Sequence, residues 1–347
     1  MRISDLTNDN NNIETTLKIY IWEKGENSMN YLITGGRGLI GCYTMRQLRT
    51  AGHSVVCIAH NLNPTSMHEV LTPEEINEIT IIEGQLNDLP FLIRTIDQYK
   101  IDVIIHQGAV LADSAEIDPI EAVQVNIVGT LKVFEAARQT GVKRVVWASS
   151  QSVFGTADFY KELYGVDLVP NDVVLNPKLV YGATKDFCEF MAEWYFKNYG
   201  LETIGLRYCM VFGVGRQRGA GQFATELINK PASGLAGNVD YGDTAPCWIY
   251  VEDAARVTVL ASQCPNPKTR NFTIGGDIVP LADIRDYILT LLPDAQITLN
   301  PGVYPAAFNL DVSAAEKELG FKCEYSVFEG VRETINLIRA KHNLALV

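Results

Sequence analysis

From Met29 onward, short apolar runs alternate along the chain with stretches in which apolar residues recur at helical spacing. The apolar runs predict buried β-strands over Tyr31–Thr34, Ser54–Ala59, Ile79–Glu83, Val103–His106, Arg144–Ser149 and Thr203–Tyr208. The stretches between them predict helices over about 39–51, 89–98, 119–140 and 178–198. Strands that are apolar throughout and alternate with helices indicate a parallel sheet covered on both faces, with right-handed crossovers.

Beyond about residue 209 this regular alternation ends. A loop rich in glycine and arginine, GVGRQRGAGQ, comes first. The elements predicted after it are a helix near 221–229, short strands near Trp248–Val251 and Asn271–Ile274, and helices near 252–262, 281–291 and 325–340. We therefore predict a larger part over 29–208 and a smaller α+β substrate-binding part over 209–347 that interlocks with it. Residues 1–28 are rich in asparagine, and we expect a poorly ordered extension there.

A glycine-rich turn joins the first predicted strand to the first predicted helix. The stretch YLITGGRGLIG at 31–41 contains Gly35, Gly38 and Gly41. Glycines let the backbone approach a pyrophosphate, and the helix that follows offers unpaired N–H groups and the positive end of its dipole. Because a strand precedes the glycines and a helix follows them, we favour a dinucleotide site over a turn without a ligand. The fold class we predict is α/β, a Rossmann-type doubly wound parallel sheet.

Composition and charge exclude several classes of protein. The formal net charge is −12, with acidic and basic residues interspersed, which argues against nucleic-acid and anionic-membrane partners. No apolar run is long enough to span a bilayer, and the first residues lack the pattern of a secretion signal. The seven cysteines are scattered, which indicates free thiols in a reducing cytoplasm. The five histidines are scattered too, so we expect no metal site and expect His106 to be a packed side chain.

Tyr181 and Lys185 have the spacing that places two residues on one face of a helix. A tyrosine has a reference pKa of about 10, which is too high for a base at neutral pH. A lysine ammonium one turn away and a positive nicotinamide ring would lower that pKa. Ser149 and Ser150 end a predicted strand, at the sheet edge where a substrate hydroxyl could be held. The pattern indicates hydride transfer with the tyrosine moving the proton.

The chain from Met29 to Ile338 resembles the extended short-chain dehydrogenases/reductases of the NAD-dependent epimerase/dehydratase family. The matching pieces are TGGRGLIG, HQGA at 106–109, NIVGT around Asn126, ASSQSVFG at 148–155, YGATK at 181–185, LRYCMVFG at 206–213 and IYVEDAA at 249–255. The resemblance implies that Ser150 is the catalytic hydroxyl and Tyr181 the acid/base. It implies that Lys185 lowers the pKa of that tyrosine and binds the nicotinamide ribose.

The resemblance also implies where the ligands bind. The expected cofactor contacts are Gly35, Arg37, Gly38, Leu39, Ile40, Gly41, His60, Gln85, Leu86, Gly108, Ala109, Asn126, Tyr181 and Lys185. The expected substrate contacts are Leu111, Gln151, Ser152, Met210, Arg216 and Trp248. For Trp248 the commoner role of a tryptophan is core packing, and for Arg216 with Arg218 the alternative is a solvated basic loop.

Departures from the family pattern narrow the substrate. Gln151 and Ser152 stand where dehydratases of this family carry an Asp-Glu pair, so we do not expect dehydration of a sugar. Met210 and Pro246 stand where nucleotide-sugar enzymes carry diphosphate-binding residues, so we favour a smaller substrate. Stretches such as AVLADSAEIDP resemble epimerase-type L-threonine dehydrogenases, but also sugar and sugar-acid dehydrogenases, so several substrates stay open.

Two further expectations concern the cofactor and the assembly. His60 and Asn61 follow a strand where an NAD enzyme would carry an acid, and Arg37 suits a 2′-phosphate, so we favour NADP over NAD. Gln85 replaces an aspartate that commonly contacts adenine. The helix carrying Tyr181 has more apolar surface than one buried face needs, and relatives pair this helix in a dimer, so we expect a homodimer.

The predicted function is that of an NAD(P)-dependent oxidoreductase or epimerase. It would transfer a hydride at a secondary alcohol of a small sugar-like or hydroxy-acid substrate. The first alternative is a nucleotide-sugar 4-epimerase with unusual diphosphate contacts. The second is a non-catalytic dinucleotide-binding protein, which the presence of both Tyr181 and Lys185 disfavours.

Overall fold

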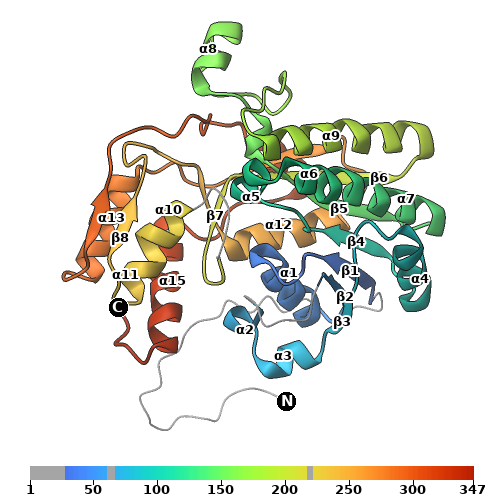
Figure 1. Ribbon diagram of the computed structural model, residues 1–347, viewed down its shortest axis with the longest axis horizontal. Helices are drawn as coiled ribbons and strands as arrows, with labels where there is room; N and C mark the ends of the chain where they lie inside the picture. The colour runs from blue at the N-terminus through green and yellow to red at the C-terminus, as the bar shows by residue number, and fades with distance from the viewer. Residues whose placement is uncertain (1–27, 61–66, 217–221) are drawn as a thin grey trace, which may run out of the picture.

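A seven-stranded parallel sheet forms the centre of the protein (Figure 1). The computed structural model describes residues 28–60, 67–216 and 222–347. The strands, in the spatial order in which they pair, are β10 (Asn271–Ile274), β6 (Glu202–Tyr208), β5 (Arg144–Ser150), β4 (Val103–His106), β1 (Asn30–Thr34), β2 (Ser54–Ala59) and β3 (Thr80–Glu83). The order reverses between β1 and β4, which makes a doubly wound sheet and confirms the predicted fold class.

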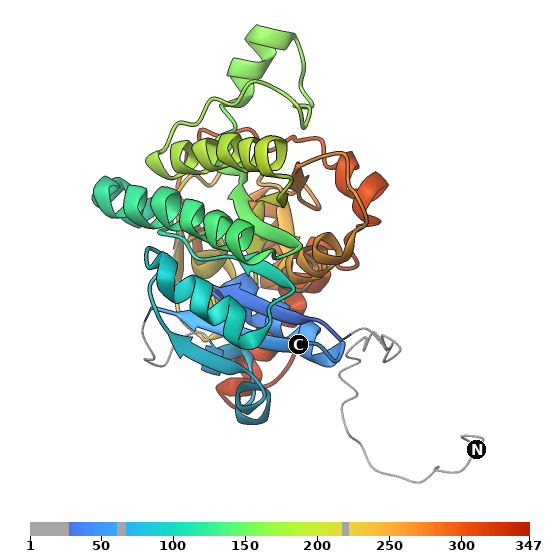
Figure 2. The same ribbon diagram turned by 90° about the vertical axis from the view of Figure 1, so that its right-hand side faces the viewer.

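Helices cover both faces of this sheet (Figures 1 and 2). One face packs against α4 (Leu89–Tyr99), α7 (Thr130–Thr140) and α9 (Val180–Tyr199), and the other against α1 (Leu39–Thr50) and α12 (Val251–Gln263). Alternate residues of each strand point to opposite helical layers, so both layers need apolar partners and the strands read as continuous apolar runs. The corresponding helix predictions agree to within a few residues.

The predicted helix over 119–140 contains an irregular turn. It is built from α6 (Pro119–Ala122), a π-helical stretch over Val123–Gly129 and α7, and α5 (Ala112–Ile117) precedes it. π-helical turns concentrate at functional sites, and this one contains Asn126. The pattern of apolar residues predicted the helix, but it carried no sign of the wider turn.

The part of the chain beyond residue 208 contributes to both halves of the molecule. Its β10 pairs with β6, and its α12 packs beside α1. The other elements there are β7 (Met210–Phe212), α10 (Gln222–Ala224), a π-helical stretch over Thr225–Asn229, α11 (Lys230–Ala232), β8 (Gly237–Val239), β9 (Trp248–Tyr250), α13 (Leu281–Leu291), β11 (Ile297–Leu299), α14 (Ser313–Leu319) and α15 (Val327–Lys341). Elements from after residue 208 therefore pack among those from before it. The predicted domain boundary between residues 208 and 209 stays a prediction.

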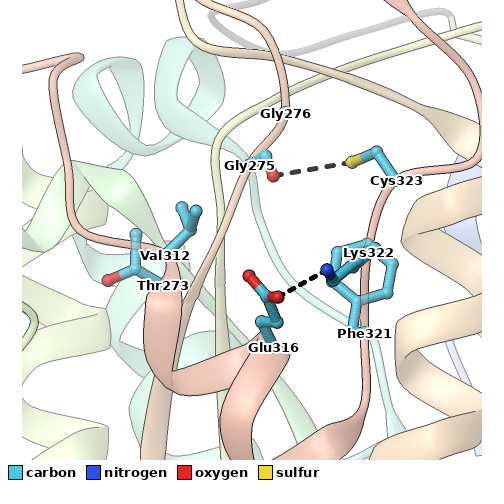
Figure 3. Close-up of a pocket in the computed structure, with 8 residues that line it drawn as sticks. All are labelled: Thr273, Gly275, Gly276, Val312, Glu316, Phe321, Lys322 and Cys323. Carbon is cyan, nitrogen blue, oxygen red and sulfur yellow. Dashed lines mark hydrogen bonds and ion pairs between the residues drawn. The ribbon is translucent and has the colours of Figure 1, made fainter.

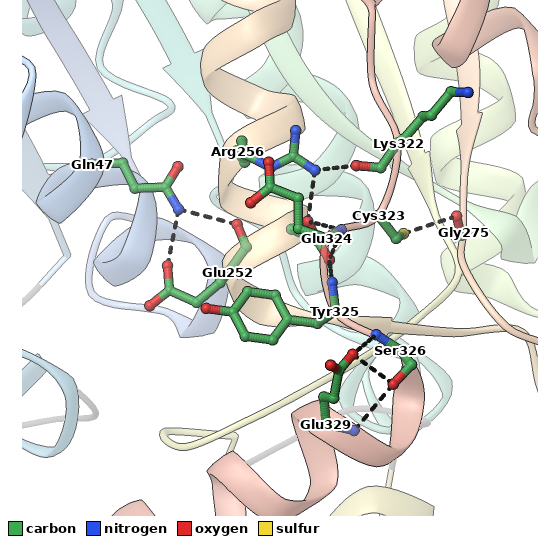
Figure 4. Close-up of polar contacts among 11 residues, drawn as sticks. Gln47, Glu252, Arg256, Gly275, Lys322, Cys323, Glu324, Tyr325, Ser326 and Glu329 are labelled. Atoms are coloured by element: carbon green, nitrogen blue, oxygen red, sulfur yellow. Dashed lines mark hydrogen bonds and ion pairs between the residues drawn. The ribbon is translucent and has the colours of Figure 1, made fainter. Parts of the chain in front are cut away.

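Polar contacts tie the end of the chain to the central layers (Figure 4). The carboxylate of Asp253, in α12, accepts hydrogen bonds from the backbone N–H groups of Glu324 and Tyr325 at 3.0 to 3.1 Å. Ser326 then caps α15 through a reciprocal pair of bonds with Glu329. These contacts fix the approach to α15 against α12, which explains how the two parts of the chain interlock.

Several short elements were not predicted, namely α2 (Met67–Val70), α3 (Pro73–Asn77), α5, α8 (Ala157–Tyr164), α14, β7, β8, β11 and the 3-10 turn Gln151–Val153. Of these, α8 stands off the body of the molecule, above α9 (Figures 1 and 2). The expectations for residues 1–27, Asn61 and Arg218 lie outside the described residues.

Candidate active site

The glycine turn after β1 forms an open cradle at the point where the strand order reverses. Gly35 has a φ of +68°, and a Cβ there would lie 2.5 Å from the backbone nitrogen of Gly108, in the loop after β4. A Cβ on Gly41 would lie 2.6 Å from the carbonyl oxygen of Gly35. Gly38 is the N-cap of α1, and no side chain caps its free N–H groups, including those of Leu39 and Ile40. These features fit a dinucleotide pyrophosphate.

His106 lies beneath this cradle as a packed, neutral side chain. Its Nδ1 is 2.6 Å from the hydroxyl of Thr34, and its Nε2 is 2.9 Å from the hydroxyl of Thr130. Complete burial and, as a smaller cause, the charge of Lys185 lower the pKa of His106 to about 3. The histidine therefore joins β1, β4 and α7, as the sequence analysis expected of a packed residue.

Asn126 supports the same loop through its amide. Its Oδ1 accepts from the backbone N–H of Val110 at 2.8 Å, and its Nδ2 donates to the Val110 carbonyl at 3.0 Å. The same Nδ2 reaches the hydroxyl of Thr184 on α9 at 3.1 Å. The amide is fully used by the protein, so Asn126 shapes the loop that contains Gly108 and Ala109.

The remaining expected cofactor contacts surround the cradle. Leu86 packs against Gly108: a Cβ added to Gly108 would lie 2.9 Å from Leu86 Cδ1. Gln85 and His60 are exposed, at the ends of β3 and β2. Burial raises the pKa of the Cys57 thiol to about 12, and the positive charge of Arg37 acts against that rise. The charge of Arg37, in the glycine turn, thus acts on a residue of β2, the strand at whose end the adenosine of a dinucleotide would lie.

Ser150, Tyr181 and Lys185 meet where β5 ends against α9. Burial raises the pKa of the Tyr181 phenol to about 12, and the Ser150 hydroxyl and the positive charge of Arg216 partly offset this rise. Desolvation dominates this shift, and the positive charge that opposes it is that of Arg216, so the expected role of Lys185 in lowering this pKa stays a prediction.

Lys185 is itself strongly affected by its surroundings. Burial lowers the pKa of Lys185 to about 8, so the ammonium is close to its titration range at physiological pH. Its Nζ lies 5.7 Å from the centre of the Tyr181 ring. A buried lysine with a perturbed pKa beside a buried tyrosine is a combination found at functional sites.

Arg216 approaches Tyr181 from the loop that follows β7. One of its Nη atoms donates to the carbonyl oxygen of Val211. Its Nε is buried and has no hydrogen-bond partner among the described residues, and the same holds for Oε1 of Gln151, next to Ser150. They are two of eight such buried side-chain atoms among the described residues, and these two give the candidate site an unused donor and an unused acceptor.

The other expected substrate contacts differ in position. Leu111 is exposed at the start of α5, and Ser152 lies beside Ser150, with a hydroxyl-to-hydroxyl distance of 3.2 Å. Met210 and Trp248 instead pair in register across β7 and β9 and lie in the core. Trp248 is 1% exposed and donates its Nε1–H to the Val279 carbonyl at 2.9 Å, which favours the packing role over contact with a ligand.

The sequence analysis missed a buried ion pair directly behind the catalytic groups. Arg207 binds Glu189 with two nitrogens, at 2.8 and 2.6 Å, and Glu189 also accepts from the hydroxyl of Ser149 at 2.6 Å. Glu189 continues the four-residue spacing of Tyr181 and Lys185 along α9, which was the available signal. The pair fixes β5 and β6 against the helix that carries the site.

Two features outside the catalytic groups complete the description of the site. Among the described residues, no group of histidine, cysteine or acidic side chains could hold a metal ion. A cavity of about 200 Å³ lies beyond the end of β10, where Glu316 and Lys322 form an ion pair at 2.7 Å (Figure 3). None of the residues that line this cavity belongs to the expected site, so it is a separate feature.

Comparison with known proteins decides the family. The sequence profile of the NAD dependent epimerase/dehydratase family matches residues 31–275. An uncharacterized protein of Methanocaldococcus jannaschii is 32% identical over 88% of this chain and 95% of its own length. This chain belongs to the NAD-dependent epimerase/dehydratase family.

The similar proteins include both dehydrogenases and nucleotide-sugar epimerases, the two enzyme classes that the sequence analysis left open. The mitochondrial L-threonine 3-dehydrogenase of Sus scrofa is 24% identical, over 92% of this chain and 85% of its own. The UDP-glucose 4-epimerase of Brucella ovis in complex with NAD has the same fold, with a TM-score of 0.75 and 23% identity, over 92% of this chain and 100% of its own.

Membership of the epimerase/dehydratase family confirms that the protein is an enzyme of the dehydrogenase and epimerase class with an NAD-type cofactor. The cradle around Gly35 is consistent with that cofactor. In the described ranges, no helix combines the length and the apolar character needed to cross a membrane.

Proposed function

We propose that this enzyme transfers a hydride at a secondary alcohol of a small hydroxy acid or sugar acid. The observation that supports it is the buried, unpaired Nε of Arg216, whose charge acts on Tyr181. A guanidinium with an unused donor is suited to a substrate carboxylate. Gln151 offers an unused acceptor for a hydroxyl of the same small molecule.

The residues of the site have distinct proposed roles. The glycine cradle and the start of α1 would hold the pyrophosphate, and Lys185 the nicotinamide ribose, while the bound nicotinamide supplies the hydride acceptor. Ser150 holds the substrate hydroxyl, and Tyr181 takes the proton of that hydroxyl as the hydride leaves the same carbon. Because burial disfavours the phenolate, Tyr181 needs positive charge nearby, and Arg216 and the oxidised nicotinamide would supply it.

Turnover by Tyr181→Phe tests the catalytic assignment. We expect NAD⁺ binding near normal and turnover lower by about 10²- to 10⁴-fold, since general acid–base catalysis is lost while the ring stays. The binding is measured by calorimetric titration and the turnover by absorbance at 340 nm. Unchanged turnover would remove Tyr181 from the mechanism.

Arg216→Met tests the substrate class. Wild-type enzyme is assayed with four- to six-carbon hydroxy acids and with the uncharged amides of the same acids. We expect the acids to be preferred, and Arg216→Met to raise KM for the acids about 10- to 100-fold while leaving the amides unchanged, because a charge-assisted bond to the carboxylate is lost. Equal use of acids and amides by the wild type would refute a carboxylate-binding role.

A second candidate function is a nucleotide-sugar 4-epimerase, which the names of several relatives favour. Against it, Met210 and Pro246 are buried apolar residues where diphosphate contacts would be needed. An epimerase would convert UDP-glucose with no net change in absorbance at 340 nm and would retain its cofactor through purification. Epimerised product in that assay would replace the proposed function by this one.

For the cofactor we propose a preference for NADP, supported by the positive charge of Arg37 in the glycine turn, which acts on Cys57 of β2. Calorimetric titration with NAD⁺ and NADP⁺ measures the preference directly. We expect tighter NADP⁺ binding that is lost in Arg37→Ala. Tighter NAD⁺ binding by the wild type, or NAD already bound after purification, would refute it.

We also propose that the protein is a cytoplasmic homodimer. The seven cysteines are all free thiols, as expected in a reducing compartment. α9 exposes Phe190, with Phe187 and Trp194 beside it, and the neighbouring α6 exposes Ile120. Such an apolar face across two adjacent helices is suited to a second copy. A monomeric mass in light scattering at micromolar concentration would count against the dimer.

A further inference from the structure

Lys185 has an aromatic environment beneath it as well as above it. Its side chain is 1% exposed, between α9 and β5. Its ammonium lies 5.7 Å from the centre of the Tyr181 ring and 5.9 Å from the ring of Trp147, in the middle of β5. A cation within about 6 Å of an indole face is attracted to the ring, most strongly for tryptophan.

Trp147 occupies its place in spite of an unsatisfied polar group. It is fully buried, and its indole Nε1 has no hydrogen-bond partner in the part of the chain that the structure describes. Asn271, two strands away, also has a buried Oδ1 without a partner. Both residues pair in register with Gly205, so the unused donor and the unused acceptor lie on either side of that glycine. Buried polar groups without partners are rare in proteins and need a reason.

The sheet is adapted to admit this indole. A Cβ on Gly205 would lie 2.2 Å from Asn271 Oδ1 and 3.0 Å from Cζ2 of Trp147, so a side chain at this position would collide with both. A phenylalanine in place of Trp147 would fill an apolar position without a buried N–H. The edge-to-face contact of Trp147 with Phe134, at 6.0 Å, would be available to a phenyl ring too. Packing alone therefore does not account for the tryptophan.

We propose that Trp147 is a positioning residue whose indole face holds the protonated ammonium of Lys185 beneath Tyr181. This role deepens the proposed function, because it matters for the reaction only if Lys185 serves the catalytic tyrosine. It gives the unpaired indole a reason, since tryptophan attracts a cation more strongly than phenylalanine does. The size of the indole ring also explains why residue 205 is a glycine, since a larger side chain there would collide with it.

Among the described residues, the thiol of Cys188 acts weakly in favour of the charged form of Lys185, and burial outweighs it. His106 on β4 is neutral, because burial lowers its pKa to about 3. Burial keeps Tyr181 and Cys188 protonated on α9, with pKa values of about 12 and 11. Since burial lowers the pKa of Lys185 to about 8, loss of the aromatic face would lower that pKa further, towards neutrality.

The experiment is a fluorescence titration of the full-length protein between pH 6 and pH 10. The chain has four tryptophans, and only an indole in contact with the titrating ammonium should report its charge. We expect a sigmoidal change in emission with a midpoint near pH 8 in the wild type. It should be absent from Trp147→Phe and from Lys185→Met, and retained in Trp248→Phe, a buried tryptophan whose N–H is bonded to a carbonyl.

Two outcomes would overturn the proposal. One is a wild-type titration curve without this transition, and the other is a transition that persists in Trp147→Phe or in Lys185→Met. The conservative Trp147→Phe variant should fold, since it keeps the contact with Phe134. The titration needs no substrate, so a failed substrate assay leaves it valid, and failure here leaves the substrate class untouched.

A functional readout follows once a substrate is in hand. In Trp147→Leu the alkaline limb of kcat/KM should move about one pH unit lower, because the deprotonated lysine then predominates earlier. Trp147→Phe should restore part of that shift, since a phenyl face keeps a weaker attraction. A pH profile identical in wild type and Trp147→Leu would contradict the positioning role.

Discussion

Two arginines, a short distance apart in the chain, are held in opposite ways. Arg207, on β6, uses three guanidinium nitrogens, two for Glu189 and one for the carbonyl of Asn171 at 2.7 Å. Among the described residues, Arg216, in the loop after β7, donates to the carbonyl of Val211 and has a buried Nε without a partner. Each guanidinium nitrogen of Arg207 is hydrogen-bonded within the protein, whereas Arg216 keeps a donor that a ligand could use.

The difference separates residues that hold the site from residues that bind a ligand. Burying a charge is expensive unless it is paired, so a satisfied buried pair indicates structure. A buried donor that stays unpaired beside the proposed catalytic groups indicates a place where a ligand completes the bonding. By this criterion the Arg207 region is the support of the active site, and the Arg216 region is part of its binding surface.

The largest effect we expect is on stability, from Arg207→Met. Removing the guanidinium leaves Glu189 charged and buried, at 4% side-chain exposure, without its cation. The free energy of unfolding should fall by about 3–5 kcal/mol. Arg216→Met is the matched control, with an expected change below about 1 kcal/mol, because it removes one bond to a carbonyl. Urea unfolding followed by circular dichroism measures both.

The double variant Arg207→Met/Glu189→Met sharpens this result. With both charges removed, no buried charge stays unpaired, so the loss should be smaller than in Arg207→Met alone. A double variant less stable than the single one would mean that the pair stabilises through its other bonds. Equal losses in Arg207→Met and Arg216→Met would remove the distinction between the two regions.

The sequence predicted most of the strands and helices around Arg207, but not the ion pair that Arg207 forms there. The apolar runs located the first six strands of the chain to within a residue or two, because a parallel sheet buried on both faces makes each strand apolar throughout. The pairing of β10 with β6 was not predictable, since both are short apolar runs and periodicity says nothing about partners. The Arg207–Glu189 pair was missed for the same reason.

For the candidate site, local spacing carried the successful part. Tyr181 and Lys185 could be placed on one helical face because their separation is one helical turn. Their pKa values could not be inferred, since these depend on burial by β4, β5 and α7. Trp248 could not be placed either, because a tryptophan suits a pocket wall and a core equally well.

The second prediction extends the comparison to Lys185. Burial lowers the pKa of Lys185 from 10.5 to about 8, so below pH 8 the folded protein bears the penalty of a buried charge. The folded state binds fewer protons than the unfolded state between pH 8 and 10.5, and stability should therefore rise over that interval. Lys185→Met should stabilise the protein by about 3 kcal/mol at pH 7, a gain that disappears by about pH 10.5.

Urea unfolding of wild type and Lys185→Met at pH 7 and pH 10.5 checks this sign. A functional residue that lowers stability contrasts with Arg207, whose loss destabilises. If Lys185→Met is less stable than the wild type at pH 7, the ammonium has stronger partners than the two rings. Lys185 would then stabilise the fold, as Arg207 does.

The smallest effect is expected for Ser149→Ala, which sharpens the description of the supporting region. The Ser149 hydroxyl donates to Glu189 at 2.6 Å, but Arg207 continues to satisfy that carboxylate when the hydroxyl is removed. The loss should be about 1–2 kcal/mol, the range for one hydrogen bond to a charged group. Thr334→Val is the control, since its hydroxyl donates to a neutral carbonyl within α15 at 2.7 Å, and it should lose less.

Because Ser149 lies next to Ser150, a drop in turnover with an unchanged KM would show that the bond also positions the catalytic hydroxyl. A stability loss no larger than that of Thr334→Val would mean that Arg207 alone holds Glu189, and that the support reaches α9 through β6 and not through β5.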